Sequence, residues 1–376
     1  MNVKDALRLA TERNGSDLYV TVGYPLSMKV NNNIISISKI PLTAGQVNQA
    51  IQALMSKERF QEFCISKESS FSTQLDGTGR FRVSAFYQKG EPGMVVRRIN
   101  TDIPTLEQLG LPQQVGDHVL NERGLILFVG AAGSGKTTSL AALIGHRNQK
   151  GSGHIITIED PIEYVHNHDK CIVTQRDVGV DTNSYEAALQ NALRQSPDVV
   201  VIGEIRSAEL MRHTIEFVET GHLCIATLHA NNTYQALERV VNFFPNNMTN
   251  QILMDLSLSM RAIIGQQLIP SKNQDRVYPA LEIMFNTPRI ADLIKRGAID
   301  ELNEAIHKSR EQGMQTFDHA LYDLYKAGKI SYDSALLHAT STNNLRLMLK
   351  MEGENPPVQN KGNSISTLNI VSDDDQ

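Results

Sequence analysis

The first hundred residues of the chain mix two spacings of hydrophobic and polar positions. Apolar side chains recur every three to four residues in residues 6–14 and 46–64, which predicts amphipathic helices. Short apolar runs bounded by glycine and proline instead indicate strands. These runs cover residues 17–22, 28–30, 71–74, 79–88 and 93–100. We therefore predict a small α+β domain over residues 1–100, followed by a proline-containing linker over residues 101–114.

From residue 115 onward, strand-like and helical segments alternate regularly. The strand-like runs cover residues 125–129, 155–158, 199–202 and 223–228, and the helical segments cover residues 136–147, 184–194, 207–219 and 234–242. This alternation is typical of a mostly parallel sheet with helices on both faces. Residues 247–350 are predicted to be mainly helical, with one short strand at 279–283. We therefore expect an α/β fold with a second domain over residues 115–350 and a disordered tail over residues 351–376.

Composition narrows the class of protein. The 376 residues are enough for two or three domains, and 36 Lys and Arg against 41 Asp and Glu give a net charge of −5, which argues against a nucleic-acid partner. No apolar run is long enough for a membrane span or a signal peptide, so we expect a cytoplasmic protein whose membrane contact is peripheral. The three cysteines are far apart, which makes a disulfide framework improbable. We interpret His166 and His168 as part of a solvated loop rather than a metal site.

A glycine-rich run lies directly between a predicted strand and a predicted helix. Its sequence over residues 130–137 is Gly-Ala-Ala-Gly-Ser-Gly-Lys-Thr, the pattern of a phosphate-binding loop. Its backbone N–H groups can converge on phosphate oxygens, and the following helix presents its positive end to the same anion. Lys136 can reach the outer phosphates, and Thr137 can offer its hydroxyl to Mg²⁺. The residues predicted to bind the nucleotide are Gly130, Ala131, Ala132, Gly133, Ser134, Gly135, Lys136, Thr137 and Thr138.

The position of each acid along its strand decides which acids can reach this loop. Asp198 and Glu204 lie at the two ends of one buried strand, about 20 Å apart at the usual rise per residue. Ligands of such sheets bind beyond the carboxyl ends of the strands. Glu204 is therefore the acid that we expect to hold Mg²⁺ through a water molecule, whereas Asp198 lies at the opposite edge.

Three more acids follow the strand at 155–158. Glu159, Asp160 and Glu163 all lie at its carboxyl end, where one of them could polarise the water that attacks a phosphoanhydride bond. Spacing alone does not choose among the three.

Histidines and arginines complete the set of candidates. His222 and His229 bracket one predicted strand, so only His229, at the carboxyl end, can contact the terminal phosphate, and His222 lies at the other edge. Arg82 and Arg97 lie on neighbouring predicted strands of the first domain. They form either a surface cluster or a set of arginine fingers that reach the phosphates of a neighbouring subunit, in which case the protein is an oligomer.

Four ordered motifs together resemble a known family. They are the phosphate loop, the acidic segment 156–164, the segment 197–206 and the segment 220–229. This set resembles the secretion ATPase superfamily, in its type IV pilus retraction branch (PilT and PilU). The resemblance implies a PAS-like N-terminal domain and a RecA-like P-loop ATPase domain with a helical C-terminal part. It also implies a hexameric ring in which ATP hydrolysis at subunit boundaries depolymerises a pilus through an inner-membrane platform protein, with the ring peripheral at that membrane.

The resemblance assigns a role to each candidate by its motif position. Lys136 and Thr137 bind phosphate and Mg²⁺, Glu204 is the Walker B acid and Glu163 is the catalytic base. Arg82 and Arg97 match the trans-acting arginines, and His222 and His229 match the histidine box.

Departures from the family pattern point to one subgroup. Ala131 and Ala132 stand where retraction motors usually have Pro-Thr, and the segments 203–207 and 287–294 match only loosely. These differences are more similar to the PilU than to the PilT subgroup. The alternative function is therefore an accessory or coupling subunit that binds ATP and docks on a related retraction ATPase. A GTPase would usually carry an Asn-Lys-x-Asp motif, which the predicted domains lack, and the acidic balance disfavours a DNA motor.

Overall fold

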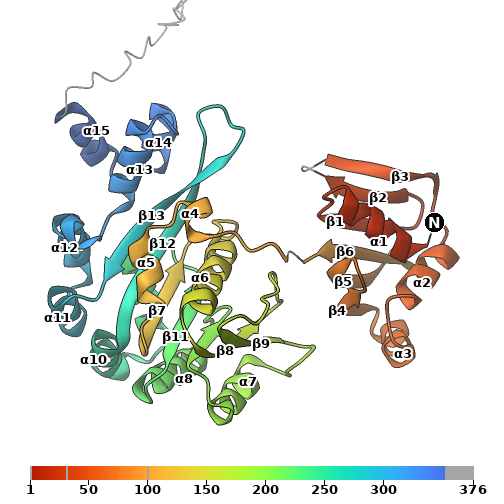
Figure 1. Cartoon of the computed structure of the whole chain (residues 1–376), viewed down its shortest axis with the longest axis horizontal. Coiled ribbons are helices and arrows are strands. Elements are labelled where there is room, and N and C mark those ends of the chain that lie inside the picture. The colour runs from red at the N-terminus through yellow and green to blue at the C-terminus, as the bar shows by residue number, and fades with distance from the viewer. Residues whose placement is uncertain (1, 31–32, 100, 352–376) are drawn as a thin grey trace, which may run out of the picture.

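The computed structural model describes residues 2–30, 33–99 and 101–351 (Figure 1). Apart from Met351, the predicted disordered tail lies outside these residues. The structure contains two β-sheets, each with its own hydrophobic core. We call residues 2–99 the N-terminal unit and residues 106–351 the larger unit.

The N-terminal unit is a six-stranded antiparallel sheet with the strand order β3-β2-β1-β6-β5-β4. Its strands are β1 (Asp17–Thr21), β2 (Pro25–Val30), β3 (Asn33–Pro41), β4 (Glu68–Leu75), β5 (Gly79–Gln88) and β6 (Glu91–Arg98). Three helices, α1 (Val3–Glu12), α2 (Ala44–Gln52) and α3 (Lys57–Ser66), pack their apolar side chains into the same core as Leu18, Val83 and Val96. Because side chains alternate along a strand, the neighbours of these residues point to the opposite face of the sheet.

Two expectations for the N-terminal unit need correction. The single helix predicted over residues 46–64 is two helices, because the Ser56 side chain accepts a hydrogen bond from the Arg59 N–H (3.2 Å) and starts α3. Strand β3 was not predicted. Its side chains are all exposed or only half-buried, so the sequence there lacks the alternation that marks a strand with one buried face.

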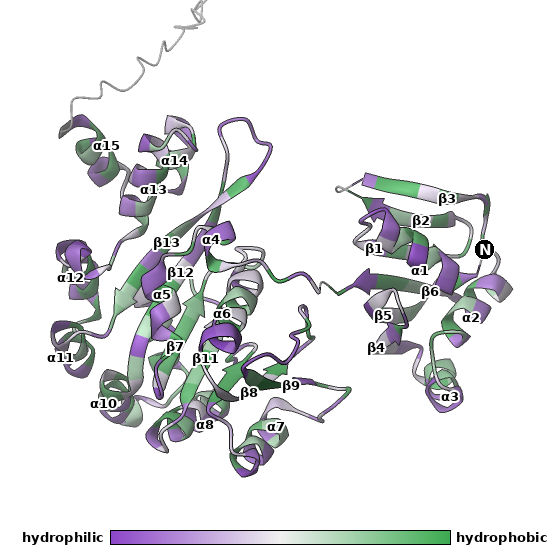
Figure 2. Ribbon diagram, in the orientation of Figure 1, coloured by the Kyte–Doolittle hydropathy of each residue, from purple (hydrophilic) through white to green (hydrophobic). Residues whose placement is uncertain are grey.

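The larger unit is a seven-stranded sheet with the order β13-β12-β7-β11-β10-β8-β9. Its strands are β7 (Gly124–Val129), β8 (Gly153–Glu159), β9 (Cys171–Asp177), β10 (Val199–Ile202), β11 (Leu223–Leu228), β12 (Met260–Pro270) and β13 (Val277–Phe285). All neighbours pair in parallel except β12 with β13. The four predicted strands and the expected α/β class are confirmed. Figure 2 shows how hydrophobic residues follow strands β7 and β11, which are buried along their whole length.

Residues 247–350 differ from the mainly helical segment that we expect. They include the antiparallel hairpin of β12 and β13, which extends well beyond the short strand predicted at 279–283. A continuous buried run such as 262–266 has no two-residue alternation, so its pattern does not separate a strand from a buried helix. Helices cover the remainder of this segment.

The helices of the larger unit connect and flank the strands. They are α4 (Leu106–Leu109), α5 (Gln113–His118), α6 (Lys136–Lys150), α7 (Tyr185–Ala192), α8 (Ala208–Glu219), α9 (Thr233–Asn242), α10 (Thr249–Ser259), α11 (Pro288–Arg296), α12 (Leu302–Lys308), α13 (Phe317–Lys326), α14 (Tyr332–His338) and α15 (Thr342–Met351). Helix α4 lies within the segment 101–114 predicted as a linker, α5 begins in it, and Leu106 and Leu111 are buried in the core of the larger unit, so this part of the predicted linker belongs to that unit. The irregular connection that precedes them covers residues 101–105.

Candidate active site

The glycine-rich loop joins the end of β7 to the start of α6. Gly133 and Gly135 have φ values of +77° and +87°, a region that residues with a side chain rarely adopt, and Gly135 is the N-cap of α6. Lys136 is buried, and its ammonium group donates hydrogen bonds to the carbonyl oxygens of Gly130 (2.8 Å) and Ala131 (2.9 Å). Burial lowers the pKa of Lys136, and the nearby negative charge of Glu204 partly offsets this.

Gln266, on β12, forms hydrogen bonds to the glycine-rich loop and to α6. The Gln266 side chain donates from Nε2 to the Ser134 carbonyl oxygen (2.8 Å), and its Oε1 accepts from the Ser139 hydroxyl (2.8 Å). A Cβ at Gly135 would lie 2.8 Å from Gln266 Nε2, so glycine is needed there for close approach as well. Sequence reasoning missed Gln266 because the segment that contains it was predicted as helix.

The residues of the loop fit a magnesium-bound polyphosphate. Among the described residues, the buried Ser134 hydroxyl has no hydrogen-bond partner, and a Cβ at Gly130 would collide with it, so this position needs glycine. A helix N-terminus with free N–H groups and a buried lysine are the donors that phosphate oxygens require. Thr137 and Glu204 would hold Mg²⁺, which supplies positive charge to the phosphate oxygens when bound.

Glu204 and His229 come together at the carboxyl edge of the larger sheet. The Glu204 carboxylate follows β10 and His229 follows β11, and His229 Nε2 lies 3.1 Å from Glu204 Oε1. The other Glu204 oxygen accepts a hydrogen bond from Arg206 Nε (2.8 Å). Asp198 lies at the opposite end of β10, where it accepts a hydrogen bond from the His154 N–H (2.7 Å). Glu204 is therefore held between two cationic or cation-forming side chains.

His222 lies far from this group along β11. Its Nδ1 lies 3.0 Å from both the Phe217 carbonyl oxygen and the Thr220 hydroxyl, at the turn that precedes the strand. The structure thus brings His229, but not His222, together with Glu204.

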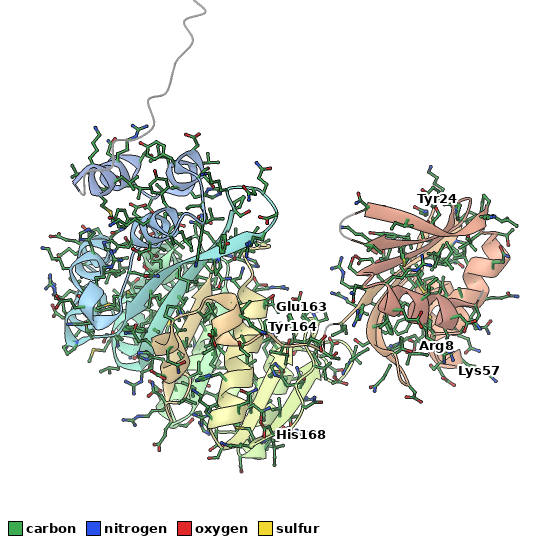
Figure 3. The ribbon with its side chains drawn as sticks, turned by 45° about the horizontal axis from the view of Figure 1, so that its top comes forward. Arg8, Tyr24, Lys57, Glu163, Tyr164 and His168 are labelled. Carbon is green, nitrogen blue, oxygen red and sulfur yellow. The ribbon has the colours of Figure 1, made fainter. Side chains whose placement is uncertain are left out.

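The three acids after β8 have different surroundings. Glu159 accepts hydrogen bonds from the Thr157 hydroxyl (2.6 Å) and from Gln175 Nε2 (3.2 Å), and burial raises its pKa. Asp160 lies 4.0 Å from the Arg206 guanidinium. Glu163 is exposed, and the hydroxyl of its neighbour Tyr164 lies 3.0 Å from the Thr138 hydroxyl on α6. Figure 3 shows Glu163 and Tyr164 on the side of the larger unit that faces the N-terminal unit.

Arg82 and Arg97 lie directly opposite each other on β5 and β6. Both project from the face of the N-terminal sheet that the helices leave open. Arg97 Nε donates to Asp17 Oδ1 (2.8 Å), and this hydrogen bond raises the Arg97 pKa, with a smaller contribution from the negative charge of Glu163. The same face also contacts the larger unit.

That contact joins β4 to the end of β9. The Ser72 hydroxyl donates to Asp177 Oδ2 (3.0 Å). Burial raises the Asp177 pKa, and the hydrogen bond from Ser72 and the charges of Arg80 and Arg82 oppose that rise. The arginine-bearing face of the N-terminal sheet therefore lies against β9, the edge strand of the larger sheet. Glu163 lies in the segment that connects β8 to β9.

Two cavities flank the phosphate loop. One, of about 620 Å³, is lined by the start of the loop, by His229 and by α9, including Gln235 and Arg239. The other, of about 450 Å³, is lined by Gly135 and Thr138 on one side and by Gln108 and Tyr278 on the other. The loop thus has space on both sides for a nucleotide larger than its phosphates.

His166 and His168 lie outside this group. His168 Nδ1 accepts a hydrogen bond from the Val173 N–H (3.0 Å), and burial lowers the His166 pKa to about 4. Among the described residues, no three His, Cys, Asp or Glu side chains are grouped so that they could hold a metal ion. None of the helices described is long and apolar enough to cross a membrane.

Comparison with known proteins identifies the family. The model of the Type II/IV secretion system protein family matches residues 2–323. The chain belongs to this family. It is an ATPase of the secretion type.

Among its relatives, the chain is more similar to PilU than to PilT. It is 53% identical to the type IV pilus ATPase PilU of Pseudomonas aeruginosa, over 94% of this chain and 93% of that protein. It is 37% identical to the type IV pilus retraction ATPase PilT of the same organism, over 89% of this chain and 97% of that protein. A crystal structure of the pilus retraction motor PilT with bound ADP superimposes with a TM-score of 0.87 at 35% identity, covering 93% of this chain and all of that one. The resemblance inferred from the four motifs is confirmed.

Proposed function

We propose that this ATPase hydrolyses Mg²⁺-ATP to drive or assist retraction of a type IV pilus. The observation that supports this most directly is the convergence of Lys136, Glu204 and His229 at one edge of the sheet, in a chain that is 37% identical to a retraction ATPase over nearly its whole length. The neighbour of known structure binds ADP, which agrees with a nucleotide at the same loop.

Each group has a distinct task in this proposal. The loop and Lys136 bind the phosphates, and Glu204 orients the water molecules around Mg²⁺. Glu163 is the base that activates the attacking water, and it is free to move because it is exposed. His229 detects the terminal phosphate through its contact with Glu204. The adenine base occupies the 450 Å³ cavity, which Tyr278 and Gln108 help to line.

Arg82 and Arg97 are the basis for proposing that the enzyme is an oligomer. These two arginines lie side by side on the sheet face that the helices of the N-terminal unit leave uncovered, and the Arg97 side chain is 69% exposed, as expected of cations that approach the phosphates of a neighbouring subunit. We propose a homohexameric ring with PAS-like and RecA-like domains, peripheral to the inner membrane and in contact with a pilus platform protein there. His222, at the other end of β11, would then face a subunit boundary.

ATP turnover by purified protein tests the enzymatic part. Lys136→Ala and Glu163→Gln should each reduce turnover at least about a hundredfold, because one removes a phosphate ligand and the other the base. Lys150→Ala and Glu219→Gln are matched controls, since both residues are exposed at the far ends of α6 and α8. Turnover at the wild-type rate in both site variants would exclude this assignment.

A second candidate is an accessory subunit whose ATP binding, rather than hydrolysis, supports a related primary motor. The Ala131-Ala132 pair in the phosphate loop and the higher identity to PilU favour it. Pilus retraction in cells that retain the primary motor separates the two. Normal retraction with Glu163→Gln, which removes the proposed base but no phosphate ligand, favours the accessory role, and loss of retraction favours the motor role.

A further inference from the structure

A buried carboxylate, Glu282, lies on the edge strand β13 and contacts the start of α9. Glu282 is only 2% exposed, and it accepts a hydrogen bond from the Thr233 N–H (2.6 Å) and interacts with the Thr233 hydroxyl. Buried acids are rare in proteins unless their oxygens are hydrogen-bonded. The contact with Thr233 therefore offsets the energetic cost of burying the Glu282 carboxylate. None of the roles proposed above uses it.

Thr233 is the first residue of α9. The first N–H groups of a helix have no partner within the helix, and a negative charge at that end is stabilising. Asn232 caps the helix by accepting from the Gln235 N–H (2.9 Å), and Glu282 satisfies the N–H of Thr233. Glu282 therefore fixes the position of the N-terminus of α9 relative to the sheet.

The segment between β11 and α9 is only residues 229–232, and it begins with His229. The sheet holds its first end, because β11 is buried and paired on both sides. Glu282 holds its other end through Thr233. With both ends fixed, four residues have little freedom, and the His229 ring is kept 3.1 Å from Glu204.

We propose that Glu282 is a positioning residue that sets the location of His229 and, through α9, the wall of the cleft beside the phosphate loop. Helix α9 contributes Gln235 and Arg239 to that wall, whereas Glu282 itself does not line the cleft. This inference rests on the proposed ATPase mechanism, in which His229 acts at the terminal phosphate.

A second buried acid provides a matched control. Asp318 on α13 is 7% exposed and accepts hydrogen bonds from the Thr340 N–H (2.8 Å) and the Ser341 N–H (3.1 Å), just before α15. It stabilises the start of a helix in the same way as Glu282, but that helix does not line either cavity beside the loop. Its loss should affect stability without affecting turnover.

The test is a double-mutant cycle in ATP turnover on the full-length protein. We expect Glu282→Leu to lower kcat between about tenfold and a hundredfold with a KM for ATP within about twofold, the size of effect that a small misplacement produces. Glu282→Gln keeps an acceptor for the Thr233 N–H and should restore most of the activity. Because Glu282 affects turnover mainly through His229, Glu282→Leu should cost far less activity in the His229→Ala background than it costs in the wild type.

Several results would overturn the inference. One is that the free-energy losses of the two single variants add in the double variant. Another is wild-type turnover in Glu282→Leu or His229→Ala. The third is an Asp318→Leu variant whose kcat falls as much as that of Glu282→Leu. If Glu282→Leu does not fold, the cycle is run with Glu282→Ala, which also removes the acceptor for the Thr233 N–H, and additivity again counts against the inference.

Amide hydrogen exchange separates this inference from the proposed function. Glu282→Leu should increase exchange in the peptide that spans residues 229–240 and leave the phosphate-loop peptide unchanged. Unchanged exchange at 229–240 overturns the positioning role even if the wild type is an active ATPase. A wild type that turns over no ATP overturns the proposed function, whereas the exchange result still reports on Glu282.

Discussion

The Asp17 carboxylate accepts a hydrogen bond from Nε of Arg97, directly across strands β1 and β6, at 2.8 Å. Asp17 is 5% exposed, and its other oxygen accepts from the Ser16 hydroxyl (2.8 Å), whereas the Arg97 side chain is 69% exposed. The bond therefore holds the guanidinium at its inner nitrogen and leaves the two terminal nitrogens free. Arg82 lies directly opposite Arg97, and the negative charge of Asp17 reduces the repulsion between these two positive side chains.

Removing that carboxylate should impair catalysis more than stability. We expect Asp17→Ala to lower kcat by about tenfold, because Arg97 loses its orientation, and to lower the free energy of unfolding by only about 1 kcal/mol, because Arg97 is solvated. Asp5→Ala is the control, since Asp5 pairs with Arg8 on the exposed surface of α1 (3.4 Å). Unchanged kcat in Asp17→Ala would argue against a catalytic role for Arg97.

Gln266 supports the phosphate loop, so its loss should weaken nucleotide binding. Gln266→Leu leaves the Ser134 carbonyl and the Ser139 hydroxyl unpaired in a buried place, which should cost about 2 kcal/mol of stability. We also expect the KM for ATP to rise several-fold. Urea unfolding and binding of a fluorescent ATP analogue measure the two effects. The neighbouring Gln267→Leu should change neither, and equal effects in both variants would contradict the prediction.

The contact between Tyr164 and Thr138 ties the acidic segment to α6. Tyr164→Phe removes the hydroxyl and should lower kcat a few-fold by loosening the segment that carries Glu163, with little change in the KM for ATP. Thr138→Val should lower kcat by a similar factor and also raise the KM for ATP, because Thr138 lines the proposed nucleotide cavity, and the kcat of the double variant should be no lower than that of the slower single variant. Steady-state kinetics at saturating ATP measures this. Multiplying losses would show that the two hydroxyls act independently.

Acid should destabilise the C-terminal helices through His319. This ring is buried, its Nδ1 accepts from the Thr316 N–H (3.4 Å), and burial together with the charges of His307 and Arg310 lowers its pKa to about 4. A histidine with a lowered pKa is neutral in the folded state, so the unfolded chain binds more protons between about pH 6.5 and pH 4. Its contribution to stability is therefore complete above pH 6.5 and is lost as the pH falls towards 4.

The matched variant for this prediction is His319→Gln, which keeps the capping interaction with Thr316 but does not titrate. Urea midpoints measured from pH 7 to pH 4 should fall less in the variant than in the wild type. Glu282 and Asp318 have raised pKa values and oppose the trend, because their protonation in the folded state adds stability in acid. Parallel curves for the two proteins would rule out His319 as the group responsible.

Ligands of parallel sheets bind beyond the carboxyl ends of the strands, and this rule made part of the site predictable from the sequence. Glu204 and His229 each follow a short buried strand, and parallel strands end at one edge, so their proximity followed from order alone. The pairing of Asp17 with Arg97 could not be read in the same way, because it depends on the register of two strands far apart in the chain. Gln266 and Glu282 were missed for a related reason. Both lie in the β12–β13 hairpin, of which only residues 279–283 were predicted as a strand, and the contact of Glu282 with Thr233 joins residues far apart in the chain.

The short connection between the two units limits how far they can separate. Residues 100–105 join the two units and span at most about 22 Å when fully extended. Arg82 and Arg97 lie on a single sheet, so any displacement of the N-terminal unit carries both guanidinium groups together. The length of this tether therefore limits how far the arginine pair of one chain can move away from the larger unit of the same chain.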